Sequence, residues 1–363
     1  MSRLSASLAV PYHPPMGRDT QRETPVSWFH TRATHYVEAQ MLFHLSQVGV
    51  IAELHRAPAT AEELAARLQL GVHVLRTMLD YVVGVDDLLQ TDERGRYVVT
   101  EFGDQVFRRF AKNELMEEFN FFDVRVGCYG PVWHHLGAML TGAARYGEDF
   151  HRVGQHAAEG VSKLSRHMIK PIDESVARTG CRHLAVIGVT PGLIEAIAEH
   201  QPGLSLYGLD RDQAALDELG AALDGKPSVR LLQGDFFKPE TWARELFGAD
   251  QPATGLLVSI HFHEFMARGI DAMKALMGAL KQQFPGWHVL ALEQDRLPES
   301  AREDTPETLW LYAHSNILIH HLIGNGKILT REEWLDVLGS GGAAVEAVIN
   351  AEYLGYHGYL VAL

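Results

Sequence analysis

The chain has 363 residues, of which 46% are hydrophobic and 21% are charged, as is usual for a protein that buries a core. At roughly 100–200 residues per domain, this length predicts two domains or one large one. The net charge of −14 argues against non-specific binding to nucleic acid or to anionic membranes.

Cysteine content and apolar run length indicate a reducing, cytoplasmic location. Only two cysteines are present, Cys128 and Cys181, which excludes a disulfide scaffold and a cysteine zinc cluster. The longest apolar runs, such as residues 255–260, are far shorter than the ~20 residues of a membrane-spanning helix, and the N-terminus lacks the apolar stretch of a secretion signal. The 20 histidines are unusual and make metal binding or acid–base chemistry worth seeking.

The N-terminal third has the order of a winged-helix domain. Residues 1–25 are aperiodic and proline-punctuated, and predict a flexible arm. Within residues 26–112, apolar positions recur at helical spacing, and Thr60 with Glu63 predicts a capping box that begins one helix. A further helix and an alternating hairpin around residues 92–95 complete the order helix, turn, helix and two-stranded wing.

The electrostatics of this domain disfavour DNA binding. The candidate reading helix, residues 72–83, offers Arg76 as its one cation and carries Asp80 besides, whereas base reading needs several basic or amide side chains. We therefore expect the winged helix to pack against a second copy of the chain in a homodimer, with no nucleic-acid or membrane partner.

The rest of the chain predicts a helical connector followed by an α/β domain. Residues 113–180 lack strand alternation and predict a helical connector or substrate lid. From residue 181 to residue 363, short apolar runs alternate with helical segments of 10–15 residues, which is typical of βαβ units and a mostly parallel sheet. The last two strands are expected to form an antiparallel edge.

Polar residues at the ends of successive strands predict a nucleoside pocket. Ligands of open α/β sheets bind outside the carboxyl ends of the strands. The first strand ends in a turn with Gly188 and Gly192, the second ends at Asp210, and the third is followed by Asp235 and Phe236. The carboxylates can accept hydrogen bonds from a ribose and an adenine, and the ring can stack. Because neither a P-loop nor a GxGxxG motif is present, the expected cofactor is S-adenosylmethionine.

Residues 27–363 resemble the class I O-methyltransferases of the plant caffeate type and their bacterial natural-product relatives. The resemblance is carried by the domain order, by Gly-Asp-Phe-Phe at 234–237, and by Gly326–Thr330 followed by Glu333 and Trp334. It implies a Rossmann-like, mostly parallel seven-stranded sheet. The family's D-x-G-G-G-x-G loop is replaced here by Val-Ile-Gly-Val-Thr-Pro-Gly at 186–192.

The family's L-H-D-W catalytic segment corresponds to Phe-His-Glu-Phe at 262–265. His261 lies two residues before His263, which we expect to place both on one strand face. A later helix carries His314, His320 and His321, of which His320 points about 100° away from the other two.

A histidine, a carboxylate and a third imidazole are typical of a facial metal site. This pattern resembles the metal-dependent branch of the family that C-methylates α-keto acids, such as phenylpyruvate or 2-ketoarginine. The resemblance implies an iron or zinc ion bound by His263, Glu264 and a histidine of the later helix. We choose His321, with His314 and His320 left open.

The expected reaction is therefore metal-assisted methylation at C3 of a 2-keto acid in natural-product biosynthesis, with His261 or His320 taking the proton. A guanidino group on the substrate would need a carboxylate such as Glu293, Asp295 or Asp123. The first alternative is a metal-independent O-methyltransferase, with His263 as base and Glu264 as its orienting partner. A relative that binds the cofactor without methylating and a winged-helix regulator are further alternatives.

Overall fold

The computed structural model describes residues 25–85, 87–111, 122–154, 166–189, 191–223, 229–247, 252–351 and 355–363. The chain divides into two compact units, Met1–Lys112 and Asn113–Leu363. The predicted N-terminal arm lies outside the described residues except for Pro25.

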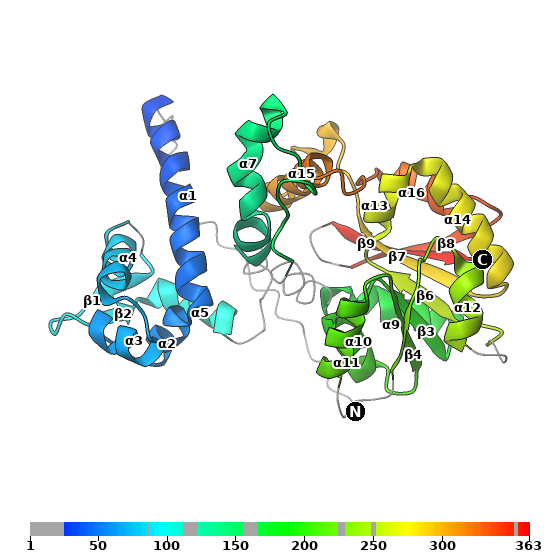
Figure 1. The fold of residues 1–363 in the computed structure, drawn as a ribbon, viewed down its shortest axis with the longest axis horizontal. Helices are drawn as coiled ribbons and strands as arrows, with labels where there is room; N and C mark the ends of the chain where they lie inside the picture. Colours follow the sequence, from blue (N-terminus) through cyan, green and yellow to red (C-terminus); the bar gives the residue numbers. More distant parts are fainter. Residues whose placement is uncertain are drawn as a thin grey trace. The chain divides into compact units, whose positions relative to one another are not determined.

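The first unit has the predicted order of a winged helix (Figure 1). Its elements are α1 (Pro25–Gln47), α2 (Val50–Arg56), α3 (Ala61–Leu68), α4 (Val72–Val85), β1 (Leu89–Thr91), β2 (Tyr97–Val99) and α5 (Glu101–Ala111). The two strands pair antiparallel. Thr60 caps α3 as predicted, because its side chain accepts from the Glu63 N–H while Glu63 accepts from the Thr60 N–H. The core of this unit joins α2, α3 and α4 to the strands through residues such as Leu54, Leu64 and Leu79.

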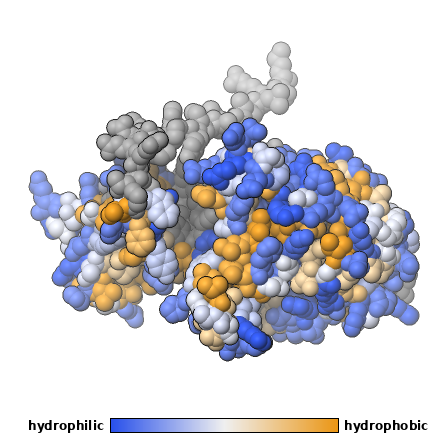
Figure 2. All heavy atoms as spheres, turned by 90° about the horizontal axis from the view of Figure 1, so that it is seen from above, coloured by the Kyte–Doolittle hydropathy of each residue, from blue (hydrophilic) through white to orange (hydrophobic). Residues whose placement is uncertain are grey.

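Helix α1 carries large apolar side chains on its surface. Val26 and Phe29 are each 66% exposed, and Trp28, Tyr36 and Val37 are exposed as well. Figure 2 shows apolar side chains lying among the polar ones on one face of the molecule. The N-terminal part of α1 therefore exposes apolar side chains, whereas Phe43 and Leu45 near its end are buried.

The second unit is built on a seven-stranded sheet of order β5-β4-β3-β6-β7-β9-β8. Its strands are β3 (His183–Ile187), β4 (Ser205–Asp210), β5 (Val229–Gln233), β6 (Leu256–Ser259), β7 (His288–Gln294), β8 (Ala344–Asn350) and β9 (Tyr356–Ala362). The first five pair in parallel, and β9 is antiparallel to both neighbours. The predicted mostly parallel sheet with an antiparallel edge is confirmed. Because β3 lies between β4 and β6, the chain order reverses there, which is where such sheets bind ligands.

Two layers of helices bury both faces of this sheet (Figure 1). One face is covered by α9 (Ile169–Thr179), α10 (Pro191–His200) and α11 (Gln213–Ala222), and the other by α12 (Pro239–Phe247), α14 (Ile270–Gln283) and α16 (Arg331–Leu338). In β3, Leu184 and Val186 pack into the first layer, whereas Ala185 and Ile187 pack into the second. Burial on both faces explains why the central strands β3, β6 and β7 are nearly continuous apolar runs.

The remaining elements surround the carboxyl ends of the strands. They are η1 (Phe122–Cys128), a π-helix, with α7 (Gly130–Thr141), η2 (Arg166–Met168), α13 (Phe262–Phe265), η3 (Met266–Arg268), η4 (Glu299–Ala301) and α15 (Glu307–Leu322). Cys128 and Val132 pack against Ile319 of α15, which joins the predicted connector to the α/β domain. No helix in the described part of the chain combines the length and apolar character needed to cross a membrane.

Candidate active site

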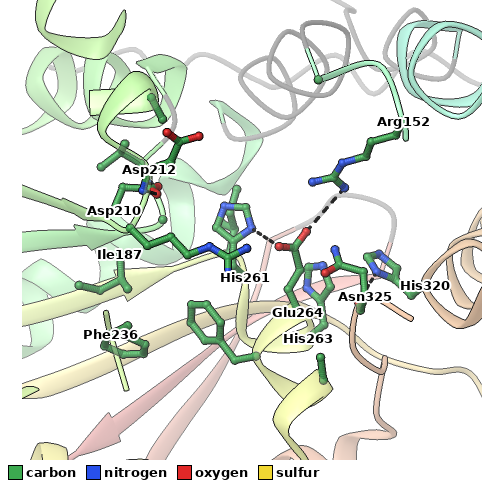
Figure 3. A pocket seen from close by; sticks show the side chains of 18 of the residues that line it. Arg152, Ile187, Asp210, Asp212, Phe236, His261, His263, Glu264, His320 and Asn325 are labelled. Atoms are coloured by element: carbon green, nitrogen blue, oxygen red, sulfur yellow. Dashed lines mark hydrogen bonds and ion pairs between the residues drawn. The ribbon is translucent and has the colours of Figure 1, made fainter. Parts of the chain in front are cut away.

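A cavity of about 540 Å³ opens at the carboxyl ends of β3, β4 and β6 (Figure 3). Its lining includes four of the predicted cofactor residues, namely Gly188, Asp210, Asp235 and Phe236. The predicted Gly192 is buried near the start of α10 and is not among the lining residues. The lining also includes residues of η1, α13 and α15. The cavity therefore has one side formed by the ends of the strands, the sheet side, and another formed by these helices, the acceptor side.

The turn after β3 is fixed by Asp210. The Val189 N–H donates to Asp210 Oδ2 at 3.0 Å, and the Asp212 N–H donates to Oδ1 at 2.9 Å. Gly188 has a φ of +74°, and a Cβ added there would lie 2.4 Å from Cδ2 of His261. The turn therefore requires glycine both for its conformation and for the close approach of the His261 ring.

Asp235 and its neighbours follow the carboxyl end of β5 and line the sheet side of the cavity. Asp235 Oδ1 accepts from the Phe237 N–H at 3.1 Å, and Arg268 Nη2 lies 3.4 Å from Oδ2. The Arg268 guanidinium carbon lies 4.0 Å from the centroid of the Phe237 ring. Phe236 lines the cavity but is only 5% exposed, because its ring packs among other aromatic side chains. Carboxylate, guanidinium and ring suit a heterocycle with an amino group.

His263 is held by a buried carboxylate from the neighbouring strand. Its Nδ1 lies 2.7 Å from Oε2 of Glu293, and its backbone N–H donates to Oε1 at 3.2 Å. Glu293 is 1% exposed and stands near the end of β7, which pairs in parallel with β6. Since Nδ1–H donates to the carboxylate, Nε2 of His263 is the nitrogen available to accept a proton.

The charge of Glu293 controls the basicity of His263. Burial lowers the pKa of His263, but the Glu293 carboxylate, with a smaller contribution from Glu264, raises it by more, so that the pKa of His263 lies above its ordinary value. A histidine paired in this way with a carboxylate is the arrangement of a general base whose protonated form is stabilised. The orienting partner is thus Glu293, and the assignment of that role to Glu264 is wrong.

Glu264 points into the middle of the cavity, between two cationic or polar groups (Figure 3). Its Oε2 lies 3.9 Å from His261 Nδ1, and its Oε1 lies 3.9 Å from Arg152 Nη1. Burial raises the pKa of the Glu264 carboxyl, but His261, His263 and Arg152 lower it by more, to about 2. Glu264 is therefore ionised at neutral pH. Burial lowers the pKa of His261, which favours its neutral form.

The segment after β6 does not continue as a strand. Strand β6 ends at Ser259, His261 precedes α13, and His263 lies within this one-turn helix. The expectation that both histidines share a strand face is therefore wrong, although both line the cavity with ring centroids 6.5 Å apart.

Helix α15 contributes His320 to the cavity rather than His321. The Nδ1–H of His320 donates to the Asn325 carbonyl at 2.9 Å, and its ring centroid lies 4.6 Å from that of His263. Burial lowers the pKa of His320 to about 3, with His263 adding to the effect. His321 is exposed, because consecutive helix positions point about 100° apart. His314 also lies outside the cavity lining, and its Nδ1 bonds to the Trp310 carbonyl.

The residues do not fit the expected metal site. Among the described residues, no group of three or more histidine, cysteine, aspartate or glutamate side chains is placed to hold an ion. His321 lies outside the cavity lining, Glu264 is drawn toward His261 and Arg152, and Nδ1 of His263 is bonded to Glu293. The triad His263, Glu264 and His321 is therefore not assembled.

Several lining residues carry no motif in the sequence. The sequence predicts Glu293 as a partner for a guanidino substrate, but this carboxylate lies behind the lining and binds His263 instead. Asp295 is likewise engaged, with Arg331 Nε at 2.9 Å, and the side chain of Asp123 lies outside the described residues. Polar lining residues that no sequence motif predicts include Arg125, Tyr129, Arg152, Asn316 and Asn325.

The loop after α15 passes directly over α13, and this predicts a strict requirement for Gly326. The Lys327 N–H donates to the His263 carbonyl at 2.9 Å, and a Cβ at Gly326 (φ +85°) would lie 1.8 Å from that same oxygen. Gly326→Ala is expected to lower the free energy of unfolding by at least ~2 kcal/mol, through backbone strain and overlap.

Gly324→Ala is the matched control for this prediction. Gly324 also has a positive φ, +62°, but no described heavy atom lies within 4 Å of an added Cβ. Its loss should be limited to the conformational cost of about 1–2 kcal/mol. Urea unfolding of both variants measures the difference, and equal losses would show that the loop does not approach His263 as described.

Comparison with known proteins identifies the fold. No family model and no curated protein sequence matches the chain. Among solved structures, the chain is similar to a putative O-methyltransferase from Nostoc punctiforme (18% identity, 93% of this chain and 99% of that chain, TM-score 0.63). It is also similar to the mitomycin 7-O-methyltransferase (16%, 93% and 97%, TM-score 0.61) and to human N-acetylserotonin methyltransferase in complex with SAM (17%, 95% and 99%, TM-score 0.60). The chain therefore has the fold of these methyltransferase structures over nearly its whole length.

Proposed function

We propose that the protein is an S-adenosylmethionine-dependent methyltransferase that methylates an oxygen of a small-molecule acceptor, with His263 as the general base. The observation that carries the proposal is that His263 lines a cavity at the carboxyl ends of the parallel strands while its Nδ1 lies 2.7 Å from the buried carboxylate of Glu293. The similarity of the fold to O-methyltransferase structures supports it.

The sheet side of the cavity suits S-adenosylmethionine. In this proposal Asp210 accepts hydrogen bonds from the ribose, and adenine binds next to Asp235, Phe237 and Arg268, all of which line the cavity. Two of the carboxylates, Asp210 and Asp235, lie at the ends of successive strands, and their negative charge favours a cationic cofactor. The bound cofactor supplies an electrophilic methyl group on a sulfonium.

The residues on the other side act on the acceptor. An acceptor hydroxyl hydrogen-bonded to Nε2 of His263 would lose its proton to that nitrogen as the oxygen attacks the methyl group. Glu293 stabilises the imidazolium that results, as a buried carboxylate next to a cation does. The remaining contribution of the protein is to hold the two reactants in line within the cavity.

Methylation at C3 of a 2-keto acid is the second candidate, without the metal ion. The observation that favours it is the presence of two guanidinium groups, Arg125 and Arg152, on the acceptor side, since a keto acid carries a carboxylate. In that reaction His263 would take the proton from C3 instead of from oxygen.

Product analysis tests the proposal and separates the two candidates. The protein is incubated with S-adenosylmethionine carrying a 13C-methyl group and with a panel of phenols, enols and 2-keto acids. Release of S-adenosylhomocysteine with a methyl carbon bonded to oxygen supports the proposal, and a methyl carbon bonded to carbon supports the second candidate. Binding of the cofactor without its turnover across the panel would favour a non-methylating relative.

We further propose a homodimer formed through α1. Val26, Phe29 and Tyr36 expose large apolar surfaces along this helix, which a second copy would bury. Light scattering at micromolar concentration should give twice the monomer mass, and Phe29→Ser with Tyr36→Ser should give the monomer. Phe102→Ser, at an equally exposed position on α5, is the control. A monomer mass for the unaltered chain would contradict the proposal.

A further inference from the structure

We infer that the acceptor is a carboxylic acid, and that Arg125 and Arg152 bind its carboxylate beside His263. This inference rests on the proposed function and specifies the substrate class of the same cavity. It follows from how the two arginines are held, from what they lie next to, and from the distribution of charge over the cavity lining.

Arg125 is fixed by a chain of amide groups that leads back to the sheet. Its Nη2 donates to Oδ1 of Asn316 at 2.7 Å, and Nδ2 of Asn316 donates to Oε1 of Gln294 at 3.0 Å. Gln294 is 2% exposed and directly follows Glu293 on β7. The guanidinium carbon also lies 5.2 Å from the centroid of the Tyr312 ring. The same strand therefore sets the position of the base and, through two amides, that of the arginine.

Arg152 is held by a different set of partners. Its Nη1 donates to the hydroxyl of Tyr129 at 3.2 Å and lies 3.9 Å from Glu264 Oε1. Tyr129 is 5% exposed, so the guanidinium is anchored to a buried ring. The ion pair with Glu264 is longer than a hydrogen bond, and an acceptor carboxylate could approach the guanidinium more closely than Glu264 does.

Both arginines lie near the proposed base. Arg152 Nη1 lies 3.9 Å from the carboxylate of Glu264, the residue that follows His263, and Arg125 lines the cavity together with His320, whose ring centroid lies 4.6 Å from that of His263. Cys128, three residues after Arg125, also lines the cavity; burial raises the pKa of its thiol, and the two guanidinium groups offset part of that rise. A carboxylate bound here would place the rest of a small acceptor within reach of Nε2 of His263.

The charges of the described lining residues differ between the two sides of the cavity. The side next to the sheet carries three carboxylates and two arginines, namely Asp210, Asp212, Asp235, Arg211 and Arg268. The acceptor side carries two arginines and a single carboxylate, Glu264. A cationic cofactor and an anionic acceptor would therefore each meet an excess of opposite charge, and guanidinium groups match a carboxylate in shape as well as charge.

The test compares acids with their amides. Calorimetry measures the binding of 2-hydroxybenzoate, 3-hydroxybenzoate and phenylpyruvate, and of the three corresponding carboxamides, to the full chain saturated with S-adenosylhomocysteine. At least one acid should bind about 10–100-fold more tightly than its amide. Arg125→Gln and Arg152→Gln should each remove most of this preference and leave the affinity of the amide nearly unchanged. Arg125→Lys keeps the positive charge but cannot donate two parallel hydrogen bonds to a carboxylate, so it should retain part of the preference for the acid.

Arg302→Gln is the matched control, because this guanidinium also stacks on an aromatic ring, that of Trp310, but is not among the cavity-lining residues. It should leave the preference for the acid intact. Equal affinities for acids and amides, no acid binding at millimolar concentration, or equal weakening of acid and amide in the arginine variants would overturn the inference.

The outcome is separable from that of the proposed function. If S-adenosylhomocysteine binds but the acids show no preference, the carboxylate site fails while the methyltransferase assignment stands. If S-adenosylhomocysteine does not bind, the acid titrations are made on the chain alone; arginine-dependent binding of acids there would leave the carboxylate site standing while the methyltransferase assignment fails.

Discussion

His263→Ala is expected to lower kcat for methyl transfer by about 10²–10⁴-fold, which is the usual contribution of a positioned general base. The reason is that His263 is the cavity-lining histidine bonded to a buried carboxylate, so its loss removes the acceptor for the substrate proton. The affinity for S-adenosylmethionine should change little, because the residues proposed to bind it follow β3, β4 and β5. Steady-state kinetics and calorimetry on the same preparation measure both quantities.

His321→Ala is the control for this variant. His321 is an exposed residue of α15 that does not line the cavity, so its replacement should leave kcat close to that of the unaltered chain. A metal site built on His321 would instead make this variant inactive. An active His263→Ala variant, or an inactive His321→Ala variant, would contradict the assignment of the base.

Glu293→Gln should produce the second large effect, lowering kcat by about 10²-fold or more, as loss of the carboxylate behind a catalytic histidine does. It should also move the pH dependence. The base must be neutral to act, so kcat falls as the pH drops through the pKa of His263. The Glu293 carboxylate raises this pKa, and its removal lowers it, so the acid limb of the profile should shift to lower pH.

Glu346→Gln is the matched control for the pH profile. Glu346 Oε2 lies 3.3 Å from Nε2 of His288, at the other end of β7 and outside the cavity lining. This variant removes the carboxylate next to His288, which lies on the same strand as Glu293, and the acid limb of its pH–kcat profile should not move. If Glu293→Gln lowers kcat while the limb stays in place, then His263 is not the group that titrates.

The fold could be predicted from the sequence because local patterns decide it. The central strands of the sheet are apolar runs buried on both faces, and each parallel strand is separated from the next by a helix with its own spacing. The turn at Gly188 and the carboxylates Asp210 and Asp235 were found because ligands of such sheets bind at known strand ends.

The acceptor side was predicted poorly because it depends on contacts between distant segments. His263 and Glu293 are 30 positions apart and meet only because β6 and β7 are neighbours. Arg125 and Asn316 are separated by 191 positions. The one available signal was the acidic Glu293 in the apolar run of β7, since a carboxylate is rarely buried there without a partner.

Helix α15 shows how a correct element can yield a wrong residue. The helix was identified, but it is apolar on more than one side, so its periodicity does not define which of two adjacent histidines faces inward. Its buried residues include Trp310, Tyr312, Ile319 and His320, which places His321 outside. The predicted metal ligands do not come together, both for this reason and because Glu264 lies between His261 and Arg152.

Calorimetric titration of S-adenosylmethionine into the protein tests the central claim most directly. We expect one site per chain, with an affinity that Asp210→Ala weakens by about 1–3 kcal/mol, because this carboxylate orders the turn after β3 and faces the proposed ribose position. Absence of binding at millimolar cofactor, or an affinity unchanged in Asp210→Ala, would contradict the account.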